Sequence, residues 1–181
     1  MTSNAREAVA RAAARRVRRT LAERWRAFAV VAVTVLLLDQ VVKAVVRATL
    51  ERGETRRLLP GLSVTRVVNE GIAFGLFPGR QAVVAILTVL ALCGITIAIV
   101  GLMQRHRGVA TGGGLLMGGS LGNLVDRLAH GGVTDYLDPA RWPAFNLADL
   151  AIVAGAALIA VGLVVSDPGN ERNAEPPWSA R

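Results

Sequence analysis

The chain has 181 residues, of which 52% are hydrophobic, and a mean hydropathy of +0.44. This composition is too apolar for an ordinary soluble domain and predicts a membrane protein. The net charge of +8 could indicate a nucleic-acid partner, but aromatic residues make up only 4% and the arginines are not interleaved with them, so we expect no nucleic acid. The single cysteine, Cys93, excludes an internal disulfide framework, and no ligands stand at metal spacing, so we expect no metal and no cofactor.

Residues 1–26 form an arginine-rich segment ahead of the first apolar run. Its eight arginines are opposed only by Glu7 and Glu23. The segment is either a helix lying on anionic lipid or a solvated tail, and we favour the tail. Because arginine-rich flanks stay in the cytoplasm, we expect the N-terminus inside. The apolar run continues into Asp39 and Lys43 without a small-residue cleavage site, so we expect no cleavable signal peptide.

Four apolar runs follow in chain order. A helical run of about 20 residues spans roughly 30 Å, the thickness of the bilayer hydrocarbon. We therefore expect an all-α membrane protein, monomeric, whose four transmembrane helices form one unit at residues 27–165. Both termini should be cytoplasmic, with a second tail at residues 166–181. The expected spans are residues 27–46, 82–103, 108–128 and 144–165.

The connection at residues 49–81 differs in character from the spans. Polar and apolar residues alternate in LSVTRVV, and AFGLFPG is rich in turn residues, which predicts short strands. We expect a small extracytoplasmic β-cradle here. Asn69 and Gly71, in NEGIAFG, mark a tight turn or a close approach of the backbone to a ligand.

Two features of the expected spans concern how they pack. Asp39 and Lys43 are four residues apart with the acid first, so they can pair on one helix face. We favour a structural ion pair over direct catalysis for these two residues. The third run contains TGGGLLMGGSLGN, and small residues let helices approach closely in lipid. We expect these glycines to leave room for a substrate or a partner helix.

Polar residues gather at the expected outer ends of the spans. Asn146 and Asp149 have the spacing of a capping box, so helix capping is the alternative to chemistry for Asp149. If each acid only capped a helix or paired with a nearby base, the acids would not need to lie on the same side of the membrane. Two adjacent carboxylates cannot both ionise cheaply; one stays protonated while the other can activate water, which permits peptide hydrolysis without a metal. The residues on this side are Asp39, Asn69, Asp126, Arg127, Asp135, Asn146 and Asp149.

Five motifs stand in order along the chain: DQVVK, NEGIAFG, GNLVDR, VTDY and FNLAD. Together they resemble lipoprotein signal peptidase, also called signal peptidase II, over about residues 25–166. The resemblance implies a multi-pass aspartyl endopeptidase of the bacterial cytoplasmic membrane, with its active site near the extracytoplasmic face. Such an enzyme removes signal peptides from prolipoproteins just before a diacylglyceryl-modified cysteine. The implied partners are therefore prolipoproteins and membrane lipid.

The resemblance also implies a role for each matching residue. Asp135 in VTDY and Asp149 in FNLAD would be the catalytic dyad. The positive end of the fourth helix would favour ionised Asp149, which leaves Asp135 to carry the shared proton. Asp138 matches no family position and is expected at the surface. Residues that would hold the substrate or support the dyad are Asp39, Lys43, Asn69, Gly71, Asn123, Asp126, Arg127 and Asn146.

Two other classes of protein stay open at this point. A small transporter or channel subunit would use the same acids as an ion path, although such proteins usually show repeats or broken helices, and no repeat is visible. An assembly protein would use buried polar groups to choose helix partners. The second alternative predicts that Asp135 and Asp149 can be replaced without losing any proteolytic activity.

Overall fold

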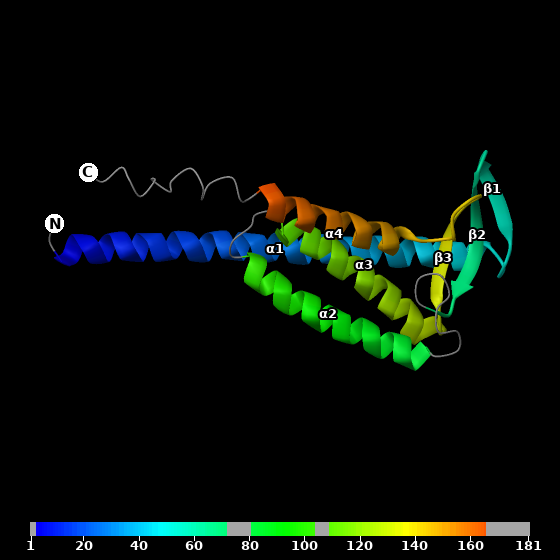
Figure 1. Cartoon of the computed structure of the whole chain (residues 1–181), viewed down its shortest axis with the longest axis horizontal. Coiled ribbons are helices and arrows are strands. Elements are labelled where there is room, and N and C mark those ends of the chain that lie inside the picture. The colour runs from blue at the N-terminus through cyan, green and yellow to red at the C-terminus, as the bar shows by residue number, and fades with distance from the viewer. Residues whose placement is uncertain (1–2, 72–80, 104–108, 166–181) are drawn as a thin grey trace, which may run out of the picture.

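Four helices and a three-stranded sheet make up the computed structural model, which describes residues 3–71, 81–103 and 109–165. The helices run along the long axis of the molecule and the sheet lies at one end of them (Figure 1). The helices are α1 Ser3–Thr49, α2 Gln81–Met103, α3 Val109–His130 and α4 Leu147–Val165. The strands are β1 Thr55–Leu59, β2 Leu62–Asn69 and β3 Val133–Pro139.

Helix α1 begins much earlier than the first apolar run. It starts at Ser3, so the arginine-rich segment is helical and continuous with the apolar part, whereas we favoured an irregular tail. Alanine and arginine are among the best helix formers, and no proline or glycine interrupts the segment, which explains the extension. Figure 1 shows this part of α1 projecting beyond the other helices on the side away from the sheet.

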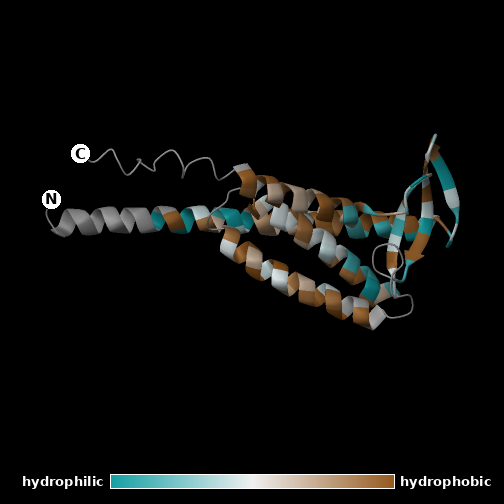
Figure 2. Cartoon of the chain, in the orientation of Figure 1, coloured by the Kyte–Doolittle hydropathy of each residue, from teal (hydrophilic) through white to brown (hydrophobic). Residues whose placement is uncertain are grey.

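Two helices are long and apolar enough to cross a membrane by length and composition. They are residues Val17–Thr49 of α1 and Leu147–Val164 of α4, while α2 contains a shorter apolar stretch, Ile86–Leu102. Apolar residues cover most of the helix lengths, and polar residues concentrate toward the sheet (Figure 2). Helix α3 is less hydrophobic than α2 and α4 because it contains many glycines and ends in polar residues.

Glycines of α3 bring the neighbouring helices into close contact. A Cβ at Gly118 would lie 2.5 Å from the carbonyl oxygen of Ala32 in α1, and one at Gly112 would lie 2.8 Å from the carbonyl oxygen of Gly155 in α4. The expectation that these glycines leave room for a partner helix is confirmed, because α1 and α4 pack against them, whereas the expectation of room for a substrate at the same glycines is wrong. Helix α3 is instead the central element against which the others pack.

The sheet is antiparallel with the order β1-β2-β3. Strands β1 and β2 confirm a β element within residues 49–81, and Gly61, with a φ of 82°, lies in the turn between them. Strand β3 was not predicted, because VTDYLDP is short and lies between two apolar runs. Its pairing with β2 sets Val67 opposite Asp135 and Asn69 opposite Val133, so the sheet carries two of the candidate site residues.

Candidate active site

A pocket of about 780 Å³ opens where α3, α4 and the β2 and β3 strands meet. Its apolar wall includes Trp142, Phe145, Ile152 and Val153. Six of the residues predicted from the sequence line it: Asn69, Gly71, Asn123, Arg127, Asp135 and Asp149. The pocket therefore combines polar groups suited to a peptide backbone with an apolar wall.

Asp135 points into this pocket from β3 and is only 3% exposed. Its Oδ1 accepts a hydrogen bond from Asn146 Nδ2 at 2.6 Å, and its Oδ2 accepts one from Asn69 Nδ2 at 3.1 Å. Burial raises the pKa of Asp135 to about 6, and the negative charge of Asp149 adds to the increase, while the two amide donors oppose it. A carboxyl group in this state can hold a proton close to neutral pH.

Asp149 occupies the first turn of α4. Its backbone N–H donates to Asn146 Oδ1 at 3.0 Å, and its own Oδ2 accepts from the backbone N–H of Asn146 at 3.2 Å. This reciprocal pair confirms the predicted capping box. The Oδ1 atom of Asp149 accepts a further hydrogen bond from Asn123 Nδ2 at 2.8 Å. The carboxylate of Asp149 thus accepts hydrogen bonds at the N-terminus of α4, the end that carries the positive pole of the helix dipole.

Two asparagine side chains link the carboxylates. Asn146 Nδ2 donates to Asp135 Oδ1 and lies 3.2 Å from Asn123 Oδ1, while Asn123 Nδ2 donates to Asp149. Asn146 and Asp149 therefore cap α4 and also belong to the hydrogen-bond chain between the two carboxylates. The amide bridge fixes the relative position of the two acids without placing a cation between them.

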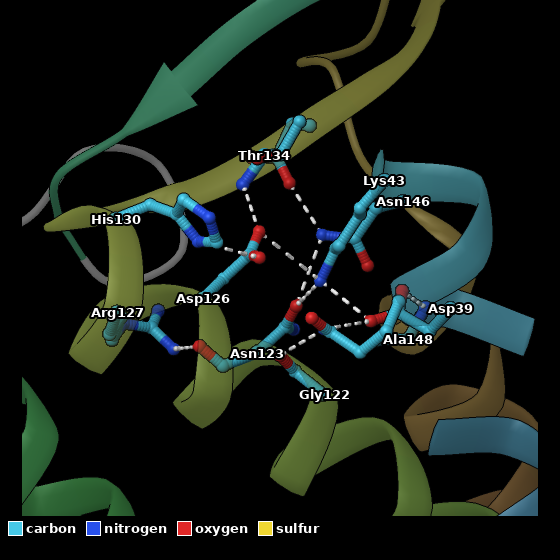
Figure 3. Close-up of polar contacts among 12 residues, drawn as sticks. Asp39, Lys43, Gly122, Asn123, Asp126, Arg127, His130, Thr134, Asn146 and Ala148 are labelled. Carbon is cyan, nitrogen blue, oxygen red and sulfur yellow. Dashed lines mark hydrogen bonds and ion pairs between the residues drawn. The ribbon is translucent and has the colours of Figure 1, made fainter. Parts of the chain in front are cut away.

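A second polar cluster, Asp39, Lys43 and Asp126, is fully buried beside the pocket and does not line it. Lys43 Nζ lies 2.9 Å from Asp39 Oδ2, which confirms the predicted ion pair, and donates to Asn123 Oδ1 at 2.7 Å (Figure 3). Asp39 Oδ1 accepts from the backbone N–H of Ala148 at 3.1 Å. The Asp39–Lys43 pair therefore holds Asn123 and the start of α4 in place through these hydrogen bonds.

Asp126 anchors β3 to α3. Its Oδ2 accepts from the backbone N–H of Thr134 at 2.7 Å, one residue before Asp135, and its Oδ1 accepts from Arg47 Nη1 at 2.8 Å. Sequence reasoning missed Arg47 and Thr134. The available signal was spacing, because Arg47 follows Lys43 by four residues on the same face of α1 as Asp39.

The segment after β2 is fixed by local hydrogen bonds. The backbone N–H of Gly71 donates to Asn69 Oδ1 at 3.0 Å, and the Gly71 carbonyl accepts from Arg127 Nη2 at 3.3 Å. These bonds confirm a tight turn at NEG. Asp138 departs from the expected surface role, because it is half-buried on β3 and its Oδ2 accepts from the Thr65 hydroxyl at 2.7 Å.

Across residues 3–71, 81–103 and 109–165, no group of three or more histidine, cysteine, aspartate or glutamate side chains could hold a metal ion.

Comparison with known proteins supplies the family. The family model described as signal peptidase (SPase) II matches residues 31–165. The chain belongs to the signal peptidase II family. It is therefore a member of a peptidase family, and the transporter and assembly-protein alternatives are set aside. The matched range contains every site residue predicted above.

Relatives support the signal peptidase II assignment over most of their length. The chain is 42% identical to the lipoprotein signal peptidase of Pelotomaculum thermopropionicum over 138 residues, which cover 76% of this chain and 90% of the relative. It is 41% identical to the lipoprotein signal peptidase of Halothermothrix orenii over 132 residues, with coverage of 72% and 90%.

Two solved structures of bacterial membrane enzymes are similar in fold to this chain. The first has a TM-score of 0.69 at 29% identity and covers 82% of this chain and 93% of its own. The second has a TM-score of 0.65 at 30% identity, with coverage of 76% and 92%. Four helices with a small antiparallel sheet are thus the architecture of a bacterial membrane enzyme.

Proposed function

We propose that the chain removes signal peptides from diacylglyceryl-modified prolipoproteins, cutting before the modified cysteine, with Asp135 and Asp149 as its catalytic dyad. One observation carries the proposal: the two carboxylates share a pocket, and Asn123 and Asn146 link them through hydrogen bonds. Their surroundings differ in a way that separates an acid from a base.

The proposed reaction uses the ionised carboxylate of Asp149 as the base. Asp149 takes a proton from water, the resulting hydroxide attacks the scissile carbonyl carbon, and Asp135 donates its proton to the carbonyl oxygen. When the tetrahedral intermediate collapses, Asp149 returns its proton to the leaving amine and Asp135 recovers a proton from the hydroxyl group. The C–N bond breaks, one water is consumed, and both carboxyl groups regain their starting states.

The proposed topology has four spans, with both termini in the cytoplasm. Arginines at the start of α1 favour the inside location for that end, and the sheet lies at the opposite end of the helices (Figure 1). The pocket lies at this same end, because residues of β2 and β3 line it. The pocket would then open at the extracytoplasmic membrane surface. A substrate held in the bilayer by its diacylglyceryl group would reach it laterally, as a monomeric enzyme permits.

Cleavage by the purified full chain in detergent, with and without a metal chelator, tests the proposal. We expect the diacylglyceryl-modified prolipoprotein to be cut equally well in both conditions, because the two carboxylates activate water themselves. The same prolipoprotein without the lipid is the control and should be cut poorly. Failure to cut the modified substrate under any lipid condition, or loss of cutting with chelator, would contradict the proposed function.

A further inference from the structure

We propose that Arg47 is a positioning residue for Asp135, acting through Asp126 and Thr134; this inference rests on the proposed function of the dyad. Arg47 lies in the last turn of α1 and none of the five motifs includes it. Its Nη1 lies 2.8 Å from Asp126 Oδ1 and 3.2 Å from the Thr134 hydroxyl. One guanidinium therefore ties α1 to both α3 and β3.

The contact to β3 falls directly before a proposed catalytic residue. Thr134 is held twice, through its backbone N–H by Asp126 and through its hydroxyl by Arg47. These two contacts restrict the movement of β3 relative to the helices, and therefore restrict the movement of the adjacent Asp135. Arg47 is itself fixed from β2, because Arg66 Nη1 donates to the backbone carbonyls of Arg47 and Leu50 at 3.2 and 2.9 Å.

Charge explains why an arginine is needed at this place. The carboxylate of Asp126 is fully buried, and a buried charge needs a close partner. Lys43 lies 3.7 Å from Asp126, and its shorter contacts are with Asp39 and Asn123. His130 lies 3.5 Å from Asp126 and is 41% exposed, which makes it a weaker counter-ion. Arg47 is the close cation for Asp126 among the residues that the structure describes.

Replacing Arg47 by alanine should lower kcat roughly 10- to 100-fold while KM changes little, because a small displacement of a catalytic group is costly and substrate contacts remain. The uncompensated charge of Asp126 should also raise the pKa of Asp135. The alkaline limb of the rate profile then moves to higher pH. The charged groups facing Asp126 are Lys43, Arg47, His130 and Arg127.

The double variant R47A/D126N separates positioning from general stability. An asparagine at this place keeps an oxygen for the Thr134 N–H and needs no cation, so the double variant should regain the wild-type pH limb and part of the kcat lost in Arg47→Ala. The several-fold loss caused by the missing Thr134 hydroxyl contact should remain. Arg47→Lys should be intermediate, because a lysine supplies the charge but not the forked contact to the Thr134 hydroxyl. Arg56→Ala, at an exposed arginine paired with Glu54, is the matched control and should act like wild type.

Amide hydrogen exchange of β3 provides a readout that needs no activity. Arg47→Ala should speed exchange at residues 133–139, and the double variant should slow it again. If Arg47→Ala does not fold, Thr134→Val removes only the hydroxyl contact and should lower kcat several-fold without moving the pH limb. Two results would overturn the proposal. One is wild-type kcat and wild-type exchange in Arg47→Ala; the other is a loss of kcat and a faster exchange in Arg47→Ala that adding Asp126→Asn does not reduce. Absence of cleavage by the wild type would instead defeat the proposed function, leaving the exchange test of the Arg47 contacts intact.

Discussion

At the residue scale, the two acids of the pocket are distinguished by what surrounds them. Asp135 is buried on a strand, and the hydrogen bonds to it come from two neutral amides. Asp149 lies at a helix N-terminus, where its carboxylate accepts hydrogen bonds from Asn123 and from the backbone of Asn146. Burial, and then the nearby charge of Asp149, raise the pKa of Asp135, so a proton is favoured on Asp135.

Replacing Asn69 by alanine should move the alkaline limb of the kcat/KM profile to higher pH. Asn69 donates to the carboxylate of Asp135 and so stabilises its charged form. Without that donor, the pKa of Asp135 rises above its value of about 6, and the protonated, active form persists to higher pH. We expect a shift of roughly one pH unit. A limb that stays in place or moves to lower pH would contradict the role given to Asn69.

Contacts between residues close in sequence could be predicted, and contacts between elements could not. The Asp39–Lys43 pair and the Asn146–Asp149 box follow from spacings of four and three residues on a helix. The bond from Asn123 to Asp149 depends on how α3 packs against α4. Glycine content alone did not show which helix would fill the space beside α3.

At the element scale, α3 is the helix on which the others depend. Its glycines meet α1 and α4 backbone to backbone, and its polar end carries Asn123, Asp126 and Arg127. The close packing therefore sets the distance between Asp39 on α1 and the site, since a Cβ at Gly122 would lie 2.5 Å from Asp39 Oδ2. Strand β3 follows α3 after a short turn in which Gly131 has a φ of 73°.

Gly118→Ala tests this packing. The added Cβ would press on the Ala32 carbonyl, and overpacking against backbone should lower the free energy of unfolding by roughly 1–3 kcal/mol. Gly101→Ala on α2 is the matched control, because nothing lies within 4 Å of its Cβ position and alanine favours a helix. Thermal unfolding of the two variants in one detergent measures the difference. Equal melting temperatures would show that α3 does not need its glycines.

The sheet shows the limit of sequence patterns at this scale. Alternation in LSVTRVV predicted β2, whereas β3 has four consecutive buried residues and no alternation. A strand buried on both sides is hard to separate from a loop by pattern alone. Motif resemblance named Asp135 as a candidate site residue, but its position on a strand could not be predicted.

At the scale of the whole molecule, the pocket and the buried polar cluster lie at the sheet end of a long, largely apolar bundle, while the arginine-rich start of α1 is hydrophilic at the other end (Figure 2). Four helices with a small sheet could be predicted, because runs of apolar residues with one polar connection leave few arrangements; two of the four helices are long and apolar enough to span a membrane among the described residues. The helical form of residues 3–26 could not be predicted from the sequence, because a segment rich in alanine and arginine can be either a helix or a solvated tail.

Deleting residues 2–20 should leave kcat/KM within about twofold of wild type. The described side chains at residues 17–20 are exposed, and the pocket lies at the other end of α1. Arg24 and Arg26 remain to hold the end of the helix inside. The measurement is cleavage in detergent by a deletion variant shown to be folded. Lost cleavage in the folded variant would assign the arginine-rich segment a part in catalysis.

The most direct test of the central claim is single-turnover cleavage of a diacylglyceryl-modified prolipoprotein by Asp135→Asn and Asp149→Asn, compared with Asp138→Asn. Asp138 is an acid on the same strand whose carboxylate contacts Thr65 and does not line the pocket. If the dyad is the catalyst, both dyad variants bind substrate but lose cleavage by several orders of magnitude, while Asp138→Asn still cleaves. Full activity in either dyad variant would contradict the account.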